Sequence, residues 1–148
     1  MTLWRLYRRK YGPGLDGSGG RAFAGRWNEA GIPIVYFGAS PAISVLEKLA
    51  NVDVAALPAD LVLARFEGEL SVEPLQGLDD VRDIAKTRMR GVAFLRACTA
   101  CVLKVPSVVL PEEANLVFNP RHPEATRIQL VCERPFSFDQ RLVNSRRH

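Results

Sequence analysis

GRWNEAGIPIVYFGASPAISVLEKLAN, residues 25–51, contains the two clearest secondary-structure patterns of the chain. Residues 32–37 are almost all apolar, which predicts a central β-strand covered on both faces. Ser40 is a good helix N-cap residue, and Pro41 suits the first helical position. The stretch therefore predicts a buried strand followed directly by a helix.

Glu47 is the candidate functional residue of this helix. The apolar residues Ile43, Leu46 and Ala50 recur at helical spacing and should form the buried face, and Glu47 lies on that face too. A carboxylate taken out of water needs a partner, and Arg26 is the one to consider. If the two groups are separated by about the length of one substrate molecule, the guanidinium would bind a phosphate and the carboxylate would stabilise a cation.

The length and composition indicate one soluble domain. A chain of 148 residues can bury an ordinary core without disulfide bonds. We expect residues 1–143 to form the domain and residues 144–148 to be a basic, disordered tail. The start has no apolar signal-peptide run, and no apolar segment approaches the ~18 residues that cross a bilayer. We therefore expect a cytoplasmic protein that does not contact membranes.

The formal net charge is +4, and much of the excess lies in the C-terminal tail. A basic balance suits a polyanion, a dinucleotide or an acidic protein partner, and does not choose among them. Basic residues interleaved with exposed aromatic residues are typical of nucleic-acid binding, and the chain has no such run. Direct binding of nucleic acid is therefore not expected.

The three cysteines are Cys98, Cys101 and Cys132. An odd number in a cytosolic chain favours free thiols. Cys98 and Cys101 have the spacing of a metal-binding or redox pair, and they also suit small core positions. A closed zinc site needs four ligands, and only Cys132 and His122 could complete it. We therefore expect no metal, and the role of the pair stays open.

The remaining patterns predict about seven short strands and two or three helices in no regular alternation. This indicates a single-domain α+β fold with a curved mixed β-sheet and flanking helices. The glycine-rich residues 12–20 should form a surface loop or a lid. Residues 102–110 form an apolar strand broken by Pro106, and a serine after a proline, here Ser107, is by itself a turn residue.

The chain resembles the RES domain, which is named for an arginine, a glutamate and a serine and occurs in toxins of bacterial RES–Xre toxin–antitoxin pairs. The resemblance rests on the order and spacing of Leu3-Trp4-Arg5, Gly25-Arg26-Trp27-Asn28, Val35-Tyr36, Ser40 to Glu47, Val105-Pro106-Ser107, and Asn115 through Asn119 to Pro123. It implies an ADP-ribosyltransferase-like fold, NAD+ as substrate rather than cofactor, and an Xre-type antitoxin as partner.

On this resemblance, Glu47 would stabilise the oxocarbenium-like ribose that forms when nicotinamide leaves. Arg26 would bind the pyrophosphate or a ribose. Tyr7 and Tyr36 would stack on nicotinamide and the adjoining sugar. Ser107 would orient the amide or the glutamate, because no histidine is placed to activate it as a nucleophile.

Several functions stay open at this point. The first is cleavage of the nicotinamide–ribose bond by an NAD glycohydrolase or phosphorylase, and the second is mono-ADP-ribosylation of a host protein. In several transferase families the residue two positions before the catalytic glutamate helps to select the acceptor, and Val45 at that position favours a small one. A ribonuclease-like toxin using Arg121 and His122 lacks a second well-placed histidine. A binding module without chemistry would not explain Glu47 on an apolar helix face.

Overall fold

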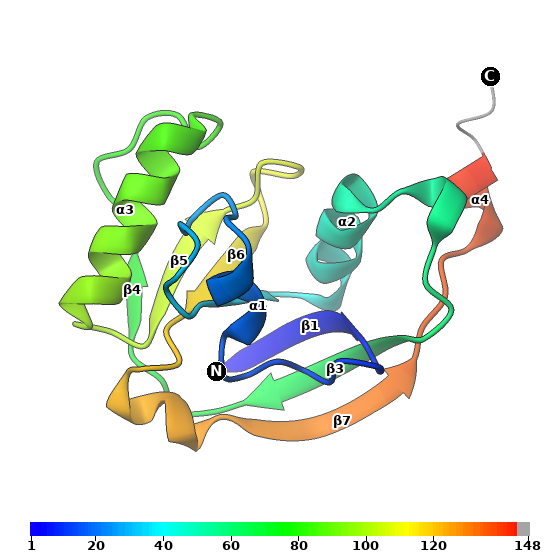
Figure 1. The fold of residues 1–148 in the computed structure, drawn as a ribbon, viewed down its shortest axis with the longest axis horizontal. Coiled ribbons are helices and arrows are strands. Elements are labelled where there is room, and N and C mark those ends of the chain that lie inside the picture. Colours follow the sequence, from blue (N-terminus) through cyan, green and yellow to red (C-terminus); the bar gives the residue numbers. More distant parts are fainter. Residues whose placement is uncertain (145–148) are drawn as a thin grey trace.

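A seven-stranded mixed β-sheet forms the centre of the structure, a computed structural model that describes residues 1–144 (Figure 1). The strands are β1 (Thr2–Arg8), β2 (Val35–Gly38), β3 (Leu61–Glu67), β4 (Val72–Pro74), β5 (Val102–Pro106), β6 (Ala114–Phe118) and β7 (Gln129–Pro135). Their order is β4-β5-β6-β2-β1-β3-β7, with β4 and β5 parallel and the other neighbours antiparallel. The predicted α+β class with a mixed sheet is confirmed.

Helices and short 3-10 turns connect these strands. They are α1 (Ser18–Ala22), α2 (Pro41–Asn51), η1 (Val54–Ala56), α3 (Ile84–Ala97), η2 (Pro123–Arg127) and α4 (Gln140–Asn144). In the part of the chain that the structure describes, none of the helices has the length and apolar character needed to cross a membrane. Asn144 of the predicted tail ends α4, and residues 145–148 lie outside the described residues.

The helix α2 begins where the sequence predicts, but its buried face is rotated from the predicted one. Ser40 Oγ accepts a hydrogen bond from the Ile43 amide, and Pro41 is the first helical residue. Ile43 and Ser44 are buried, whereas Ala50 is exposed. The reason is a close approach to the sheet at Gly38, where a β-carbon would overlap Ser44 Oγ. Ser44, a small polar residue, is therefore part of the buried face of α2, where the sequence pattern predicted mainly apolar residues.

The strand predicted at residues 32–37 is shorter and later, at Val35–Gly38. Pro33 has no backbone N–H to donate to a neighbouring strand, which explains why regular pairing begins after it. Ile34 is nevertheless buried, with an exposed fraction of 2%. The apolar run thus predicted burial correctly and the strand boundaries less well.

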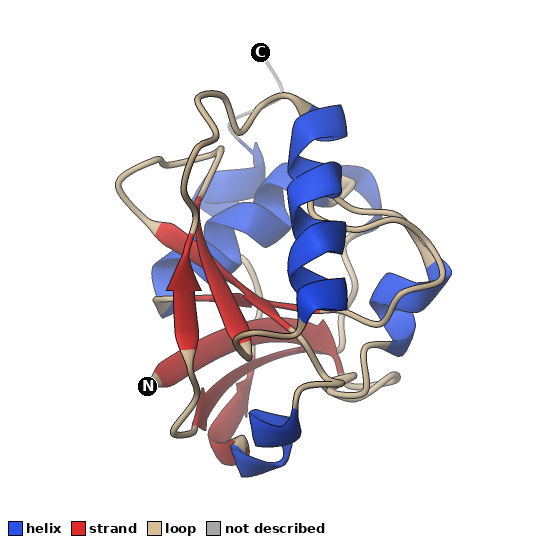
Figure 2. Cartoon of the chain, turned by 90° about the vertical axis from the view of Figure 1, so that its left-hand side faces the viewer, coloured by secondary structure: helices blue, strands red, loops and turns tan. Residues whose placement is uncertain are grey.

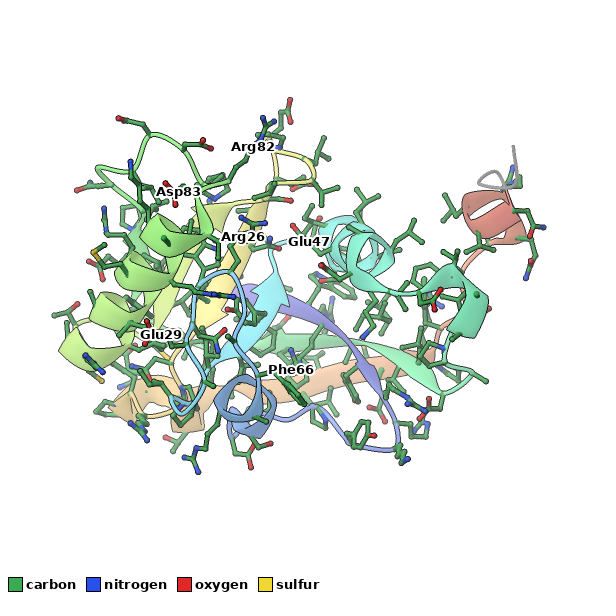
Figure 3. The ribbon with its side chains drawn as sticks, turned by 45° about the horizontal axis from the view of Figure 1, so that its top comes forward. Arg26, Glu29, Glu47, Phe66, Arg82 and Asp83 are labelled. Carbon is green, nitrogen blue, oxygen red and sulfur yellow. The ribbon has the colours of Figure 1, made fainter. Side chains whose placement is uncertain are left out.

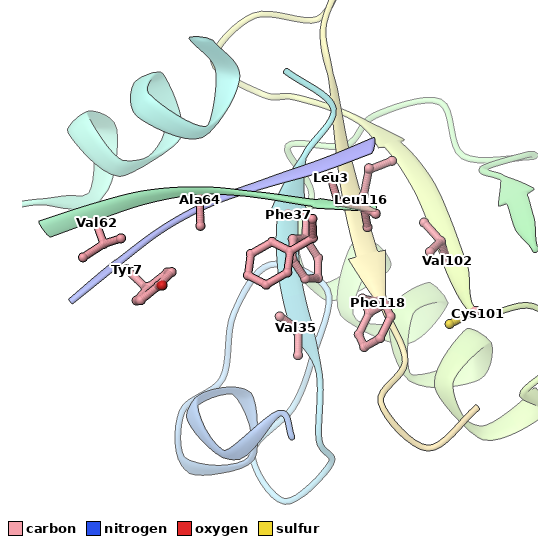
Figure 4. Close-up of a cluster of buried hydrophobic side chains, with 11 residues drawn as sticks. Leu3, Tyr7, Val35, Phe37, Val62, Ala64, Cys101, Val102, Leu116 and Phe118 are labelled. Carbon is pink, nitrogen blue, oxygen red and sulfur yellow. The ribbon is translucent and has the colours of Figure 1, made fainter. Parts of the chain in front are cut away.

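The hydrophobic core lies on both faces of the sheet. One face carries a cluster in which Phe37 packs edge-on against Phe66 and Phe118, with ring centroids 5.5 Å apart in each pair (Figure 4). Two separate clusters lie on the other face, one under α3 around Phe94 and one near α2 around Leu49. Figure 2 shows α3 standing upright over its half of the sheet. Because α2 and α3 cover different halves of the same face, a space remains between them.

Cys98 ends α3 in the left-handed conformation, with φ of 53°, and its N–H donates to the Phe94 carbonyl at 3.1 Å. Glycine adopts this conformation without the penalty that a β-carbon brings. We expect Cys98→Gly to raise the free energy of unfolding by about 0.5–1 kcal/mol, the left-handed penalty less the extra entropy of an unfolded glycine. Urea denaturation measures this. Cys98→Ala keeps the penalty and should not stabilise, and equal stabilities of the two variants would contradict the explanation.

Candidate active site

A pocket of about 670 Å³ lies between α2 and α3. The strands β1 and β2 pair only at Trp4 and Gly38, whereas β1 pairs with β3 along all seven of its residues. Beyond that single pair β1 and β2 diverge, and Arg5 and Tyr36 next to it both line the pocket. Side chains of α2, α3, the segment 25–27 and the segment after β5 complete the walls.

Glu47 lies on the α2 wall of this pocket, and its carboxylate is held by two neutral donors. Ser107 Oγ donates to Glu47 Oε1 at 2.6 Å, and Asn115 Nδ2 donates to the same oxygen at 2.8 Å. Ser107 is completely buried, and its hydroxyl oxygen accepts the N–H groups of Val109 and Leu110. These contacts commit the hydroxyl proton of Ser107 to Glu47. Because both donors reach Oε1, the other carboxylate oxygen stays available to a ligand.

Arg26 lines the same pocket from the α3 side (Figure 3). Its Nη1 donates to the carbonyl oxygens of Val81 at 2.9 Å and Arg82 at 3.5 Å. The ion pairs formed within residues 1–144 do not include Arg26 with Glu47, so the direct partnership considered from the sequence is absent. The structure instead places the two residues on the walls of one cavity without an ion pair between them.

Tyr36 contributes its ring to the pocket, while its hydroxyl is used elsewhere. The hydroxyl donates to Asn28 Oδ1 at 2.5 Å and accepts the Trp27 amide at 3.1 Å. Burial raises the pKa of Tyr36 to about 12, so the phenol stays protonated at neutral pH. A ligand can therefore stack on this ring but would have to compete for its hydroxyl.

Tyr7 is buried on the opposite face of the sheet, against Val62 and Phe66, and does not line the pocket. Its hydroxyl donates to Glu133 Oε2 at 2.6 Å, and burial together with this carboxylate raises the pKa of Tyr7 to about 12. Side chains alternate along β1, so Leu6 faces the pocket and its neighbour Tyr7 faces away. This position contradicts the predicted contact between Tyr7 and nicotinamide.

Arg5 is a pocket residue for which the sequence predicted no role. Its Nε donates to the Pro13 carbonyl at 2.7 Å and its Nη1 to the Tyr36 carbonyl at 2.8 Å. Burial lowers its pKa to about 10, which leaves the guanidinium charged at neutral pH. The conspicuous Trp4-Arg5 pair was the signal that could have identified it.

The pocket is strongly cationic. The residues that line it include Arg5, Arg26, Lys48 and Arg88, against the single carboxylate of Glu47. Burial and the nearby arginines lower the pKa of Lys48. Such a surplus of positive charge suits a ligand that carries phosphate groups.

The residues of the alternative predictions lie elsewhere. His122 caps η2, where its Nδ1 accepts the Glu124 amide at 3.1 Å, and neither His122 nor Arg121 lines the pocket. Cys101 is buried and Cys132 exposed. Within residues 1–144 no three histidine, cysteine or acidic side chains gather in a way that could hold a metal ion.

Known proteins resemble this chain over nearly its whole length. The family model "RES domain" matches residues 2–139. A "Toxin Res" of Pseudomonas putida (strain KT2440) is 37% identical, over 96% of this chain and 99% of that protein. A "Prs ADP-ribosylating toxin" of a Sphingobium species (strain YBL2) is 30% identical, over 96% of each chain.

A solved structure shows the same fold. The chain aligns with a TM-score of 0.76 and 20% identity, over 97% of its own length and 87% of the other chain, to a structure described as the "M.tuberculosis MbcT-MbcA toxin-antitoxin complex". At this level of identity the likeness concerns the fold alone. The family match and the two toxins of similar length carry the assignment, and they show that the chain belongs to the RES domain family.

Proposed function

We propose that this RES-domain protein is the toxin of a bacterial toxin–antitoxin pair and acts in the cytoplasm by consuming NAD+. The reaction is cleavage of the bond between nicotinamide and ribose. The observation that carries the proposal is the carboxylate of Glu47, fixed by Ser107 and Asn115 on the wall of a pocket that is otherwise cationic. The names of the related toxins support it.

The chemistry requires a negative charge at one point of the pocket. As nicotinamide leaves, positive charge develops on the ribose carbon and its ring oxygen. A carboxylate held beside that carbon stabilises the charge, and it does so most effectively when its position is fixed before the reaction. The hydrogen bonds to Oε1 fix Glu47 in this way, and the remaining oxygen would face the ribose. Ser107 and Asn115 thus orient the carboxylate rather than react with the substrate.

The rest of the substrate is anionic. Arg26, with Arg88, offers guanidinium groups that can donate hydrogen bonds to the pyrophosphate. The ring of Tyr36 is available to stack on the nicotinamide or the adjoining sugar. NAD+ is therefore the substrate, and its pyridinium ring is a good leaving group because departure neutralises its charge.

The acceptor of the ADP-ribose is the second question. Water or phosphate gives a glycohydrolase or phosphorylase, which is our first assignment. Transfer to a protein is the second candidate, favoured by the name of the Sphingobium relative, an ADP-ribosylating toxin. Val45 does not decide between them. It packs against the cluster around Leu6 and Leu49, because residues two apart on a helix point about 200° apart.

Incubation of the purified protein with NAD+ and, separately, with RNA tests the assignment. Free nicotinamide with intact RNA is the expected result. Chromatography of the second product then separates free ADP-ribose, ADP-ribose 1-phosphate and labelled protein. Intact NAD+ together with shortened RNA would overturn the proposal in favour of a nuclease.

Binding of NAD+ should depend on the shape of the cation at position 26. Arg26→Lys keeps the charge but cannot reproduce the forked donors of a guanidinium, so we expect about a tenfold weaker affinity, equal to 1.4 kcal/mol. Calorimetric titration of the Glu47→Gln protein, with and without the second change, measures binding without turnover. Equal affinities would move Arg26 to a purely structural role.

An antitoxin should neutralise the enzyme by covering the pocket. An acidic side chain or a terminal carboxylate would complement the cationic lining, and we propose an Xre-type partner on the basis of the family. Inhibition should then be competitive with NAD+. Co-expression with the neighbouring antitoxin gene, co-purification and nicotinamide release at rising NAD+ concentrations measure this. A complex that keeps full activity would contradict occlusion.

A further inference from the structure

We propose that Thr87 is a positioning residue that fixes the backbone of Arg26 from α3. Thr87 is completely buried, and its Oγ1 donates to the Arg26 carbonyl oxygen at 2.6 Å. The Ile84 carbonyl, one turn back in the same helix, lies farther from this hydroxyl, at 3.1 Å. The single hydroxyl proton of Thr87 is therefore directed at the residue that carries the pocket guanidinium. The consequence for catalysis rests on the proposed function.

The same helix contacts the residues on both sides of Arg26. Arg88 Nε donates to the Gly25 carbonyl at 2.8 Å. Gly91 lies so close to the chain that a β-carbon there would overlap the Trp27 carbonyl oxygen. Three successive carbonyl groups, those of residues 25–27, thus face one side of α3.

The segment 25–28 needs such anchors because it lies outside the seven-stranded sheet. Its backbone pairing is an isolated bridge between Gly25 and Asn28. On the side away from α3, Asn28 and the hydroxyl of Tyr36 hold it, as described above. Thr87 supplies the opposite attachment, so the segment is fixed between β2 and α3.

The effect of Thr87 should appear in substrate binding and not in the chemical step. Arg26 is assigned to the pyrophosphate, whereas Glu47, which is assigned to the ribose, is carried by α2 and held by β6 and the segment after β5. A shift of the Arg26 backbone would move the guanidinium relative to the phosphates and leave the carboxylate in place. An interaction that binds the substrate and the transition state equally affects only KM, so its loss raises KM and leaves kcat unchanged.

Thr87→Val tests this, because it removes the hydroxyl at constant volume. In the protein without ligand, hydrogen exchange at the amides of residues 25–28 should become about tenfold faster, because the bond that is removed holds the segment closed. KM for NAD+ should rise by about tenfold with kcat within about twofold. Thr87→Ser should restore both values. Thr126→Val, an exposed threonine on η2, is the matched control and should change neither.

Each outcome decides a separate question. Wild-type exchange rates in Thr87→Val would overturn the anchoring, whether or not the protein turns over NAD+. Faster exchange with unchanged KM, or a loss confined to kcat, would overturn the link to Arg26. A wild-type protein that leaves NAD+ intact would refute the proposed function while the exchange comparison still tests the anchor. If the valine variant does not fold, Thr87→Ala removes the same hydroxyl without adding an apolar group.

Discussion

Glu47→Gln is expected to keep the fold and to lose at least about 10²-fold in turnover of NAD+, as commonly follows removal of a charge that stabilises the transition state. The amide oxygen of glutamine can still accept the hydrogen bonds of Ser107 and Asn115, so the buried donors keep a partner. What disappears is the negative charge beside the ribose carbon. Nicotinamide release under saturating NAD+, together with thermal unfolding, separates the loss of charge from a loss of structure.

A second carboxylate provides the control for this experiment. Glu29 is exposed and does not line the pocket, so Glu29→Gln should keep wild-type turnover (Figure 3). A folded Glu47→Gln protein with unchanged turnover would remove the glutamate from the mechanism. A similar loss in both variants would indicate an effect of net charge and not of the site.

Gly91→Ala should destabilise the protein and weaken binding of NAD+ together. The added methyl group would overlap the Trp27 carbonyl, which is backbone and cannot rotate away. Overpacking of this kind costs about 1–3 kcal/mol in the free energy of unfolding. Because relief requires the segment around Arg26 to move from α3, affinity for NAD+ should fall as well.

The matched control is Gly19→Ala. A β-carbon at Gly19, which lies in α1, would meet nothing within 4 Å. Alanine there should leave stability unchanged or raise it by about 0.4–1 kcal/mol through the unfolded state. Urea denaturation and calorimetry with NAD+ give both quantities. If Gly91→Ala behaved like Gly19→Ala, the close contact between α3 and the segment would not constrain the structure.

The features predicted best from the sequence are those with local causes. The start of α2 follows from the cap at Ser40 and the proline after it, which act within one helical turn. The apolar run of residues 32–37 likewise predicted a buried strand, observed as β2 at Val35–Gly38. The helix α2 also carries Glu47 to the pocket, although its buried residues are Ile43, Ser44 and Leu49 and not the predicted set.

The partners of Glu47 could not be derived from local patterns. Ser107 and Asn115 are 60 and 68 residues away in the chain, and a strand order that places β6 beside β2 brings them near α2. The resemblance to the family implied a role for Ser107, and it included Asn115 among the matching residues without a role for it. Tyr7 was misplaced for a related reason: which face of β1 meets the pocket depends on where α2 packs.

The one-residue pairing between β1 and β2 has a mechanical consequence. It divides the sheet into two blocks, β4-β5-β6-β2 and β1-β3-β7, which within residues 1–144 are joined across the ladder by the Trp4 and Gly38 pair. Glu47 is bonded through Ser107 and Asn115 to the first of these blocks. The helix α3, which contacts the segment of Arg26, packs on the same block. Twisting one block against the other breaks fewer backbone hydrogen bonds at this joint than at any fully paired strand. Glu47 and Arg26 therefore keep their separation when the blocks twist at this joint, whereas Arg5 of β1 would move relative to both.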